Sequence, residues 1–270
     1  MSAINRQNDS RRRLRRLLPA IGAGLLVVAA VAGGVVLSWG RPAVGAHRAS
    51  VRGAGPTHRA PTTTTTVPPD PNVSVVAYSA VPSLAVFPAP GAPAPSTQLA
   101  NPNSEGAPLV VLVRTRQAGW DQVQLPQRPN GATGWVRDAD VKLYSDNVKV
   151  VVHLRAHTID VYKEGQVVDH QPVIDGSPAS PTPTGSFYVT ELLKAPNPSG
   201  PYGPYAFGLA AFSDTYTEFE GGPGQIAIHG TNQPWLMGQS ASHGCVRLLN
   251  SALVQLVNEV PVGTPVEIDA

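Results

Sequence analysis

An uncharged apolar run constrains this chain more than any other feature. Residues 17–40 contain no Asp, Glu, Lys or Arg over 24 positions. As a helix they would extend about 36 Å, enough to cross a hydrocarbon core of about 30 Å. Six arginines precede the run, with Asp9 as the one acidic residue before it. This pattern predicts a basic cytoplasmic tail over residues 1–16, a single-pass transmembrane signal anchor over 17–40, and export of the remainder.

A cleaved signal peptide is the alternative for the same segment. Val44-Gly45-Ala46 offers a cleavage site of small residues. The apolar run is longer than the usual apolar region of a signal peptide, which spans roughly 7–15 residues. The length therefore favours an uncleaved anchor, and either alternative places the rest of the chain outside the cytoplasm.

Proline and glycine limit what the exported part can fold into. The chain has 28 prolines and 26 glycines, and only 14% of its residues are charged. Such a composition predicts a mainly β fold, with strands and turns outweighing helices. The basic residues gather before the apolar run, so we expect no nucleic-acid-binding surface. Residues 41–72 include five consecutive threonines, Thr62 to Thr66, among several prolines. They are predicted to form an extended Pro/Thr-rich linker.

Residues 73–145 show the pattern of a small domain built from short strands. Leu109 to Val113 predict a buried strand, and Trp120 to Leu125 alternate between apolar and polar. Pro129-Asn130-Gly131 is a strong turn signal, and Gly134-Trp135-Val136 follows it. This arrangement resembles bacterial SH3-like domains and predicts a small β-barrel. Whether the domain binds a ligand or serves as a spacer is left open by its sequence.

Residues 148–270 predict a second domain with several strands and one helix. Lys163-Glu164-Gly165 predicts the turn of a hairpin, and Thr182-Pro183-Thr184-Gly185 predicts a loop that leads into a strand. Asn250 is predicted to cap a helix that Pro261 ends. The predicted strands are Val148–His153, Thr158–Tyr162, Gln166–Asp169, Ser186–Val189, Ile226–Ile228 and Val266–Ile268, and the predicted apolar side of the helix is Leu253, Val254, Leu256, Val257 and Val260.

Cys245 is the only cysteine of the chain. An exported lone cysteine has no intrachain partner for a disulfide, so it predicts a nucleophile or an intermolecular bridge. A thiol attacks as its thiolate, and its ordinary pKa of about 8.5 leaves little thiolate at neutral pH. A neighbouring base is therefore needed.

Two histidines are candidates for that base. His243 lies two residues before Cys245, and His229 ends an apolar strand and is followed by Gly230. The spacing favours His229, and His243 remains the alternative. Gly244 permits a tight turn that could direct the amides of Gly244 and Cys245 toward one point as an oxyanion hole.

The joint pattern is more specific than any of its residues. Ile228-His229-Gly230-Thr231 is followed by Ser242-His243-Gly244-Cys245-Val246-Arg247. This pattern resembles the signature of L,D-transpeptidases, the YkuD-type catalytic domains of bacterial cell-wall enzymes, over residues 148–270. The resemblance implies a β-sandwich with one helix.

The resemblance also implies a role for each site residue. Cys245 would be the nucleophile and His229 the general base, with the Gly230 carbonyl holding the imidazole. Ser242 and His243 would shape the turn, and the amides of Gly244 and its neighbours would form the oxyanion hole. The implied substrate-binding residues are Arg247, for a carboxylate, and Asn232, Trp235, Tyr202 and Tyr205, in the cleft.

The implied reaction is acyl transfer on peptidoglycan stem peptides, giving 3→3 crosslinks at the outer side of the membrane. Alternatives on the same scaffold are an L,D-carboxypeptidase or hydrolase, an enzyme attaching proteins to the wall, and a non-catalytic wall-binding protein. We expect no cofactor and no metal. His153 and His157 have metal-ligand spacing for a helix, but their surroundings predict strand and turn. Glu218 and Glu220 are interpreted as loop residues that aid solubility.

Overall fold

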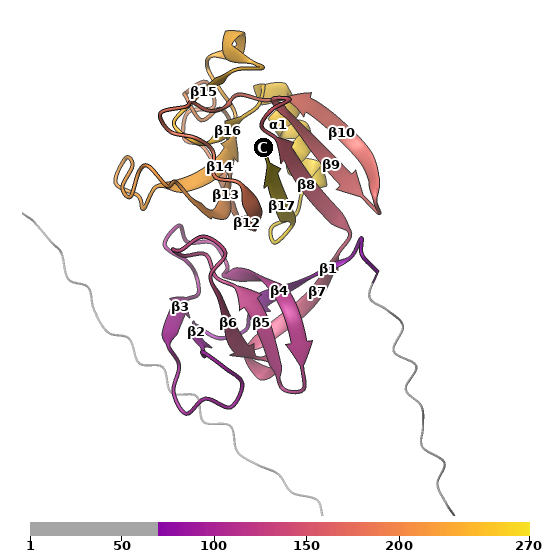
Figure 1. The fold of residues 1–270 in the computed structure, drawn as a ribbon, viewed down its shortest axis with the longest axis vertical. Coiled ribbons are helices and arrows are strands. Elements are labelled where there is room, and N and C mark those ends of the chain that lie inside the picture. The colour runs from indigo at the N-terminus through magenta and orange to yellow at the C-terminus, as the bar shows by residue number, and fades with distance from the viewer. Residues whose placement is uncertain (1–69) are drawn as a thin grey trace, which may run out of the picture. The chain divides into compact units, whose positions relative to one another are not determined.

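The computed structural model describes residues 70–270. The predicted basic tail, the predicted transmembrane segment and nearly all of the predicted linker lie outside this range. Among the residues that are described, no helix is long and apolar enough to cross a bilayer. The fold is mainly β with one α-helix, which confirms the predicted class for this part of the chain (Figure 1).

The first sheet has five antiparallel strands in the order β6-β5-β4-β1-β7. Its core contains fully buried Ala77, Val111, Val123 and Val136. The predicted strands at 109–113 and 120–125 correspond to β4 and β5. The elements of this region are β1 (Ser74–Ser79), a hairpin of β2 (Ser83–Val86) and β3 (Thr97–Ala100), β4 (Val110–Gln117), β5 (Trp120–Gln124), β6 (Thr133–Arg137), the 3-10 turn η1 (Asp138–Asp140) and β7 (Val141–Asp146). The likeness to SH3 domains stays a prediction.

The second sheet has eight strands in the order β10-β9-β8-β17-β12-β13-β14-β16. Strand pairs β8–β17 and β14–β16 are parallel, and the other neighbours are antiparallel. The six predicted strands and the β9–β10 hairpin are confirmed. The strands are β8 (Val148–His153), β9 (Thr158–Lys163), β10 (Gln166–Pro172), β12 (Gly185–Lys194), β13 (Tyr205–Phe212), β14 (Gln225–His229), β16 (Val246–Arg247) and β17 (Pro265–Asp269), with β11 (Asp175–Gly176) pairing with β15 (Ser240–Ser242) beside them and η2 (Pro234–Leu236) before β15.

The strands of this region are linked as one eight-stranded sheet whose two halves are joined by β12: Gly185–Tyr188 pair with β17, and Val189–Lys194 pair with β13. The β-sandwich that the resemblance implied stays a prediction. The sheet curls, so that residues from both ends share one core. Val150 and Val161 from β8 and β9 belong to the same buried cluster as Phe207 and Ile228 from β13 and β14.

Helix α1 (Asn250–Glu259) adds Leu253 and Leu256 to this core. Two predictions about it are wrong. Leu249, not Asn250, occupies the N-cap, because the Asn250 carboxamide oxygen accepts a hydrogen bond from the Thr231 amide at 2.9 Å instead. Val254 is 44% exposed, because it lies on the face of the helix turned away from the sheet.

The two sheets contact each other through polar and apolar groups. The Gln124 amide nitrogen donates to the Ser186 carbonyl at 2.9 Å, and the Arg114 guanidinium donates to the Ser186 hydroxyl at 3.0 Å. Leu112 packs with Tyr188 and Ala210 in a small buried cluster. The first sheet is thus attached to strands that continue into the site described next.

Candidate active site

Strands β14 and β16 bring two distant sequence segments together. In their parallel pairing Ile228 lies opposite Val246, and His229 lies opposite Arg247. Ile228 and Val246 point into the core. Because side chains alternate along a strand, His229 and Arg247 point to the other face, as does Cys245, two residues before Arg247. All three line one cavity of about 360 Å³.

His229 is 2% exposed and has a defined orientation. Its Nδ1 lies 2.7 Å from the carbonyl oxygen of Gly230, the contact that the resemblance implied. A carbonyl only accepts, so Nδ1 carries the proton and Nε2 of the neutral ring remains an acceptor. Burial, aided by the positive charge of Arg247, lowers the pKa of His229 to about 4. The imidazole is therefore neutral at physiological pH and able to accept a proton.

Cys245 is a free, partly exposed cysteine. Burial of the thiol raises its pKa, while a main-chain hydrogen bond from Ala227 and the charge of Arg247 act in the opposite direction. At rest the site therefore holds a neutral thiol and a neutral imidazole rather than an ion pair. Such a pair must transfer its proton during attack on a substrate.

The turn before Cys245 is held by the Ser242 hydroxyl. This oxygen accepts from the Gly244 amide at 3.0 Å and donates to the Cys245 carbonyl at 2.6 Å. Gly244 has φ +117°, a conformation that side chains other than glycine's rarely adopt. The expectation that both Gly244 and Cys245 offer free amides is wrong for Gly244, because Ser242 already engages its N–H.

Two buried hydroxyl groups, those of Ser180 and Thr182, donate hydrogen bonds to main-chain carbonyls of the turn before Cys245. Ser180 Oγ donates to the His243 carbonyl at 2.7 Å, and Thr182 Oγ1 donates to the Gly244 carbonyl at 2.8 Å. Each carbonyl shares a rigid peptide plane with the following N–H. Thr182 therefore sets the direction of the Cys245 amide. The sequence predicted the loop Thr182–Gly185, but no sequence pattern indicated that Thr182 would bind the Gly244 carbonyl.

The cavity carries charges of both signs. Arg247 donates from Nη1 to Gln233 at 3.3 Å, and its Nε is buried without a hydrogen-bond partner in the described structure. The Tyr202 hydroxyl donates to the Glu220 carboxylate at 2.5 Å, and burial together with this contact raises the pKa of Tyr202. The Tyr202 ring centroid lies 4.9 Å from that of His229.

Glu220 was interpreted from the sequence as a loop residue that aids solubility, yet its side chain lines the cavity. It also has a left-handed backbone, with φ 48°. No local pattern distinguishes it from Glu218. The contact with Tyr202 depends on two loops that are separated in sequence and meet only in the folded chain.

Not every predicted cleft residue reaches the cavity. Tyr202 and His243 line it, and the His243 ring lies 5.6 Å from that of Phe219. Asn232 and Trp235 are exposed, Trp235 by 68%, and neither lines the cavity. Tyr205 packs against the core instead.

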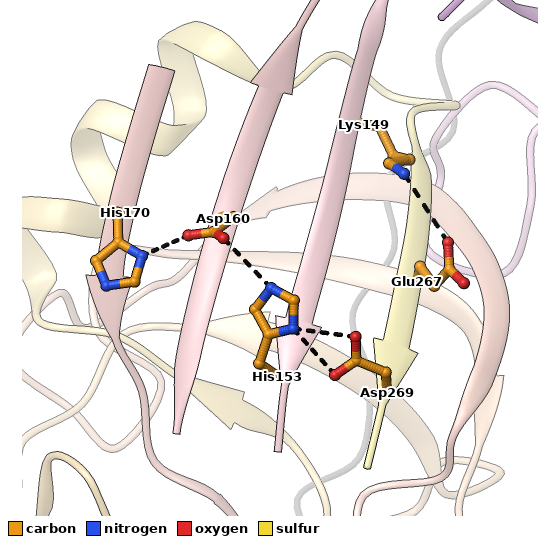
Figure 2. Close-up of polar contacts among 6 residues, drawn as sticks. All are labelled: Lys149, His153, Asp160, His170, Glu267 and Asp269. Atoms are coloured by element: carbon orange, nitrogen blue, oxygen red, sulfur yellow. Dashed lines mark hydrogen bonds and ion pairs between the residues drawn. The ribbon is translucent and has the colours of Figure 1, made fainter. Parts of the chain in front are cut away.

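The other histidines of the second sheet bind carboxylates on its outer face. His153 lies between Asp269 and Asp160, and Asp160 also accepts from His170, forming a row across four strands (Figure 2). His157 is separate and lies 2.7 Å from Asp175. Between residues 70 and 270, no three His, Cys, Asp or Glu side chains converge as metal ligands.

The region that contains the site is similar to known proteins. The family model for the L,D-transpeptidase catalytic domain, YkuD, matches residues 147–268. The protein named L,D-transpeptidase YkuD in Bacillus subtilis is 31% identical over 126 residues, which are 47% of this chain and 68% of that protein. Its namesake in Bacillus licheniformis is 32% identical over 120 residues, 44% of this chain and 64% of that protein.

Solved structures of L,D-transpeptidases are also similar. The enzyme from Mycobacterium smegmatis is 18% identical, with 60% of this chain and 90% of that chain covered and a TM-score of 0.38. One from Mycobacterium tuberculosis is 20% identical with the same coverage and score. The match of the family model and the identity to the Bacillus proteins decide the assignment: this chain belongs to the L,D-transpeptidase family.

Proposed function

We propose that this chain is a peptidoglycan L,D-transpeptidase that forms 3→3 crosslinks through a thioester on Cys245. The observation that carries the proposal is one cavity lined by Cys245, His229 and Arg247, with His229 oriented by the Gly230 carbonyl. A thiol, an oriented neutral imidazole and a cation are the groups needed to open an amide beside a carboxylate.

The first step is acylation. Cys245 Sγ attacks the carbonyl of the third stem residue, and its proton passes to His229 Nε2. The developing oxyanion takes a hydrogen bond from the Cys245 amide, which Thr182 orients through the Gly244 carbonyl. The C–N bond then breaks, and D-alanine leaves as the amine after His229 returns the proton. Arg247 is placed to bind the carboxylate of the departing D-alanine.

The second step regenerates the enzyme. An amine on the third residue of a neighbouring stem attacks the thioester, and His229 accepts one of its protons. The C–S bond breaks, the sulfur is reprotonated, and the new amide joins the two stems. The enzyme ends as it began, and one D-alanine has been exchanged for one crosslink.

Product analysis tests this proposal. Purified protein is incubated with a disaccharide tetrapeptide, alongside Cys245→Ala and His229→Ala. We expect a 3→3 dimer and free D-alanine from the wild type and neither from the variants. A tripeptide as the sole product would indicate hydrolysis, and a product retained by Cys245→Ala would contradict the thioester.

We also propose that the catalytic domain works in the cell-wall space, held to the membrane by residues 17–40. The uncharged run and the arginines before it support this placement. Fractionation of cells that express the full chain tests it: we expect the protein with the membranes, at its uncleaved mass.

A further inference from the structure

One wall of the catalytic cavity is the loop of residues 213–224, here named the cavity loop. The Ser213 amide donates to the Gly224 carbonyl at 2.8 Å and closes the base of the loop. From this loop, Tyr216, Phe219 and Glu220 line the cavity. The loop therefore helps to shape the space in front of Cys245.

Arg128, which lies between β5 and β6 of the first sheet, binds both ends of this loop. Its Nη1 donates to the Ser213 carbonyl at 2.8 Å. Its Nη2 donates to the Tyr216 carbonyl at 3.0 Å and to the Pro223 carbonyl at 3.1 Å. A guanidinium presents several donors in one plane, so a single side chain joins three separate carbonyls. All three acceptors are main-chain carbonyls, so the link depends on the Arg128 side chain and not on any side chain of the loop.

Asn130 adds a second attachment two residues further on. Its Nδ2 donates to the Phe212 carbonyl at 2.8 Å, and its Oδ1 accepts from the Phe212 amide at 2.8 Å. The two bonds satisfy both main-chain groups of the residue that leads into the loop. The turn predicted at Pro129-Asn130-Gly131 thus places an arginine and an asparagine against the neighbouring domain.

Contacts continue from the cavity loop to the catalytic residues. The Phe219 ring lies 5.6 Å from that of His243, and the Glu220 carboxylate accepts a hydrogen bond from the Tyr202 hydroxyl. Tyr202 in turn packs on His229. A change in the position of the loop would alter both the walls of the cavity and the surroundings of the proposed base.

We propose that Arg128 and Asn130 are positioning residues of the active site, and that residues 73–145 serve to hold the cavity loop in its substrate-binding conformation. The part concerning catalysis rests on the proposed function, whereas the attachment of the loop does not. The small domain would then contribute to acyl transfer without touching substrate.

Two measurements on the same set of variants test the proposal: the rate of amide hydrogen exchange in the cavity loop and the rate of Cys245 acylation. The variants are Arg128→Ala and the nearly isosteric Asn130→Asp. Arg137→Ala is the matched control, because Arg137 lies in the same domain but stacks over Phe87 and Trp120. Loss of charge-assisted bonds should speed exchange in peptides covering 213–224 by about tenfold in Arg128→Ala, with a smaller rise in Asn130→Asp. Acylation of Cys245 by a carbapenem should slow by a similar factor, while the control stays within about twofold of wild type for both readouts.

Three results would overturn the proposal. Exchange in 213–224 equal to that of the control would show that Arg128 does not hold the loop. A rise spread evenly over both sheets would show general destabilisation instead. Faster exchange in the loop with an unchanged acylation rate would remove its link to catalysis. If wild type itself is not acylated, the proposed function fails, and exchange alone decides whether Arg128 holds the loop.

Discussion

His229 and His243 both line the cavity of Cys245, but their surroundings differ. His229 is buried and hydrogen-bonded to the Gly230 carbonyl, whereas His243 is exposed, with its ring 5.6 Å from that of Phe219. Of the two, only His229 is oriented by a main-chain carbonyl, which leaves its Nε2 available to accept the proton of the thiol. We expect His229→Gln to slow carbapenem acylation by a hundredfold or more, because a general base contributes about 10² to 10⁴. His243→Asn should cost about tenfold or less by the same scale. Stopped-flow absorbance measures both rates, and equal losses would contradict the assignment.

The hydrogen bond from Thr182 to the Gly244 carbonyl gives a second prediction at the residue scale. Thr182→Val removes the hydroxyl that holds the Gly244 carbonyl and that accepts the Gly176 amide at 2.8 Å. We expect kcat on a muropeptide donor to fall by about tenfold to a hundredfold, with KM nearly unchanged, because the oxyanion donor is misplaced. Thr182→Ser keeps the hydroxyl and should retain most of kcat. Similar kcat values for the two variants would show that the hydroxyl does not act on the turn.

Residues close together in sequence were the predictable part of the site. Cys245, Ser242 and Gly244 form one short motif, and His229-Gly230 is recognisable at a strand end. Glu220 lines the cavity, whereas Ser180 and Arg128 bind the turn and the loop that shape it. All three come from segments that only folding brings near, so no local pattern marks them. Asn250 was misjudged for the same reason, since its partner Thr231 is remote in sequence.

At the scale of elements, helix α1 tests which apolar residues stabilise the catalytic domain. Leu253 is fully buried against the curled sheet, whereas Val254 is 44% exposed. Leu253→Ala should lower the free energy of unfolding by about 2–5 kcal/mol, because it removes buried methyl groups and leaves a cavity. Val254→Ala should change it by less than about 0.5 kcal/mol. Urea unfolding followed by circular dichroism compares the two, and equal losses would place the helix differently.

The positions of the strands along the sequence were more predictable than the order in which the strands pair in the sheet. Period-two alternation and β-branched residues mark β8, β9 and β17, and the Lys163-Glu164-Gly165 turn joins β9 to β10 as predicted. The sequence does not say that β17, at the end of the chain, inserts between β8 and β12. Such long-range pairing depends on how the whole core packs.

For the whole molecule, the buried His229 links stability to pH. Folding lowers the pKa of His229 from 6.5 to about 4. Between pH 6.5 and pH 4, the unfolded chain therefore binds a proton at this residue that the folded chain does not bind. Stability therefore falls as pH drops from 7 to 4, by about 3 kcal/mol from this group. His229→Gln lacks that contribution, so its loss of stability over the same range should be smaller by about this amount. Urea titrations of both proteins at pH 7, 5 and 4 give the difference, and parallel curves would show that His229 is not buried in its neutral form.

The central claim is that Cys245 captures an acyl group as a thioester within the cavity shared with His229. Intact-protein mass spectrometry after incubation with a carbapenem measures this most directly, with peptide mapping to locate the adduct. We predict a single addition of the mass of the carbapenem on Cys245, complete in wild type and absent in Cys245→Ala. A folded wild-type protein that gains no mass, or an adduct that maps to another residue, would contradict the claim.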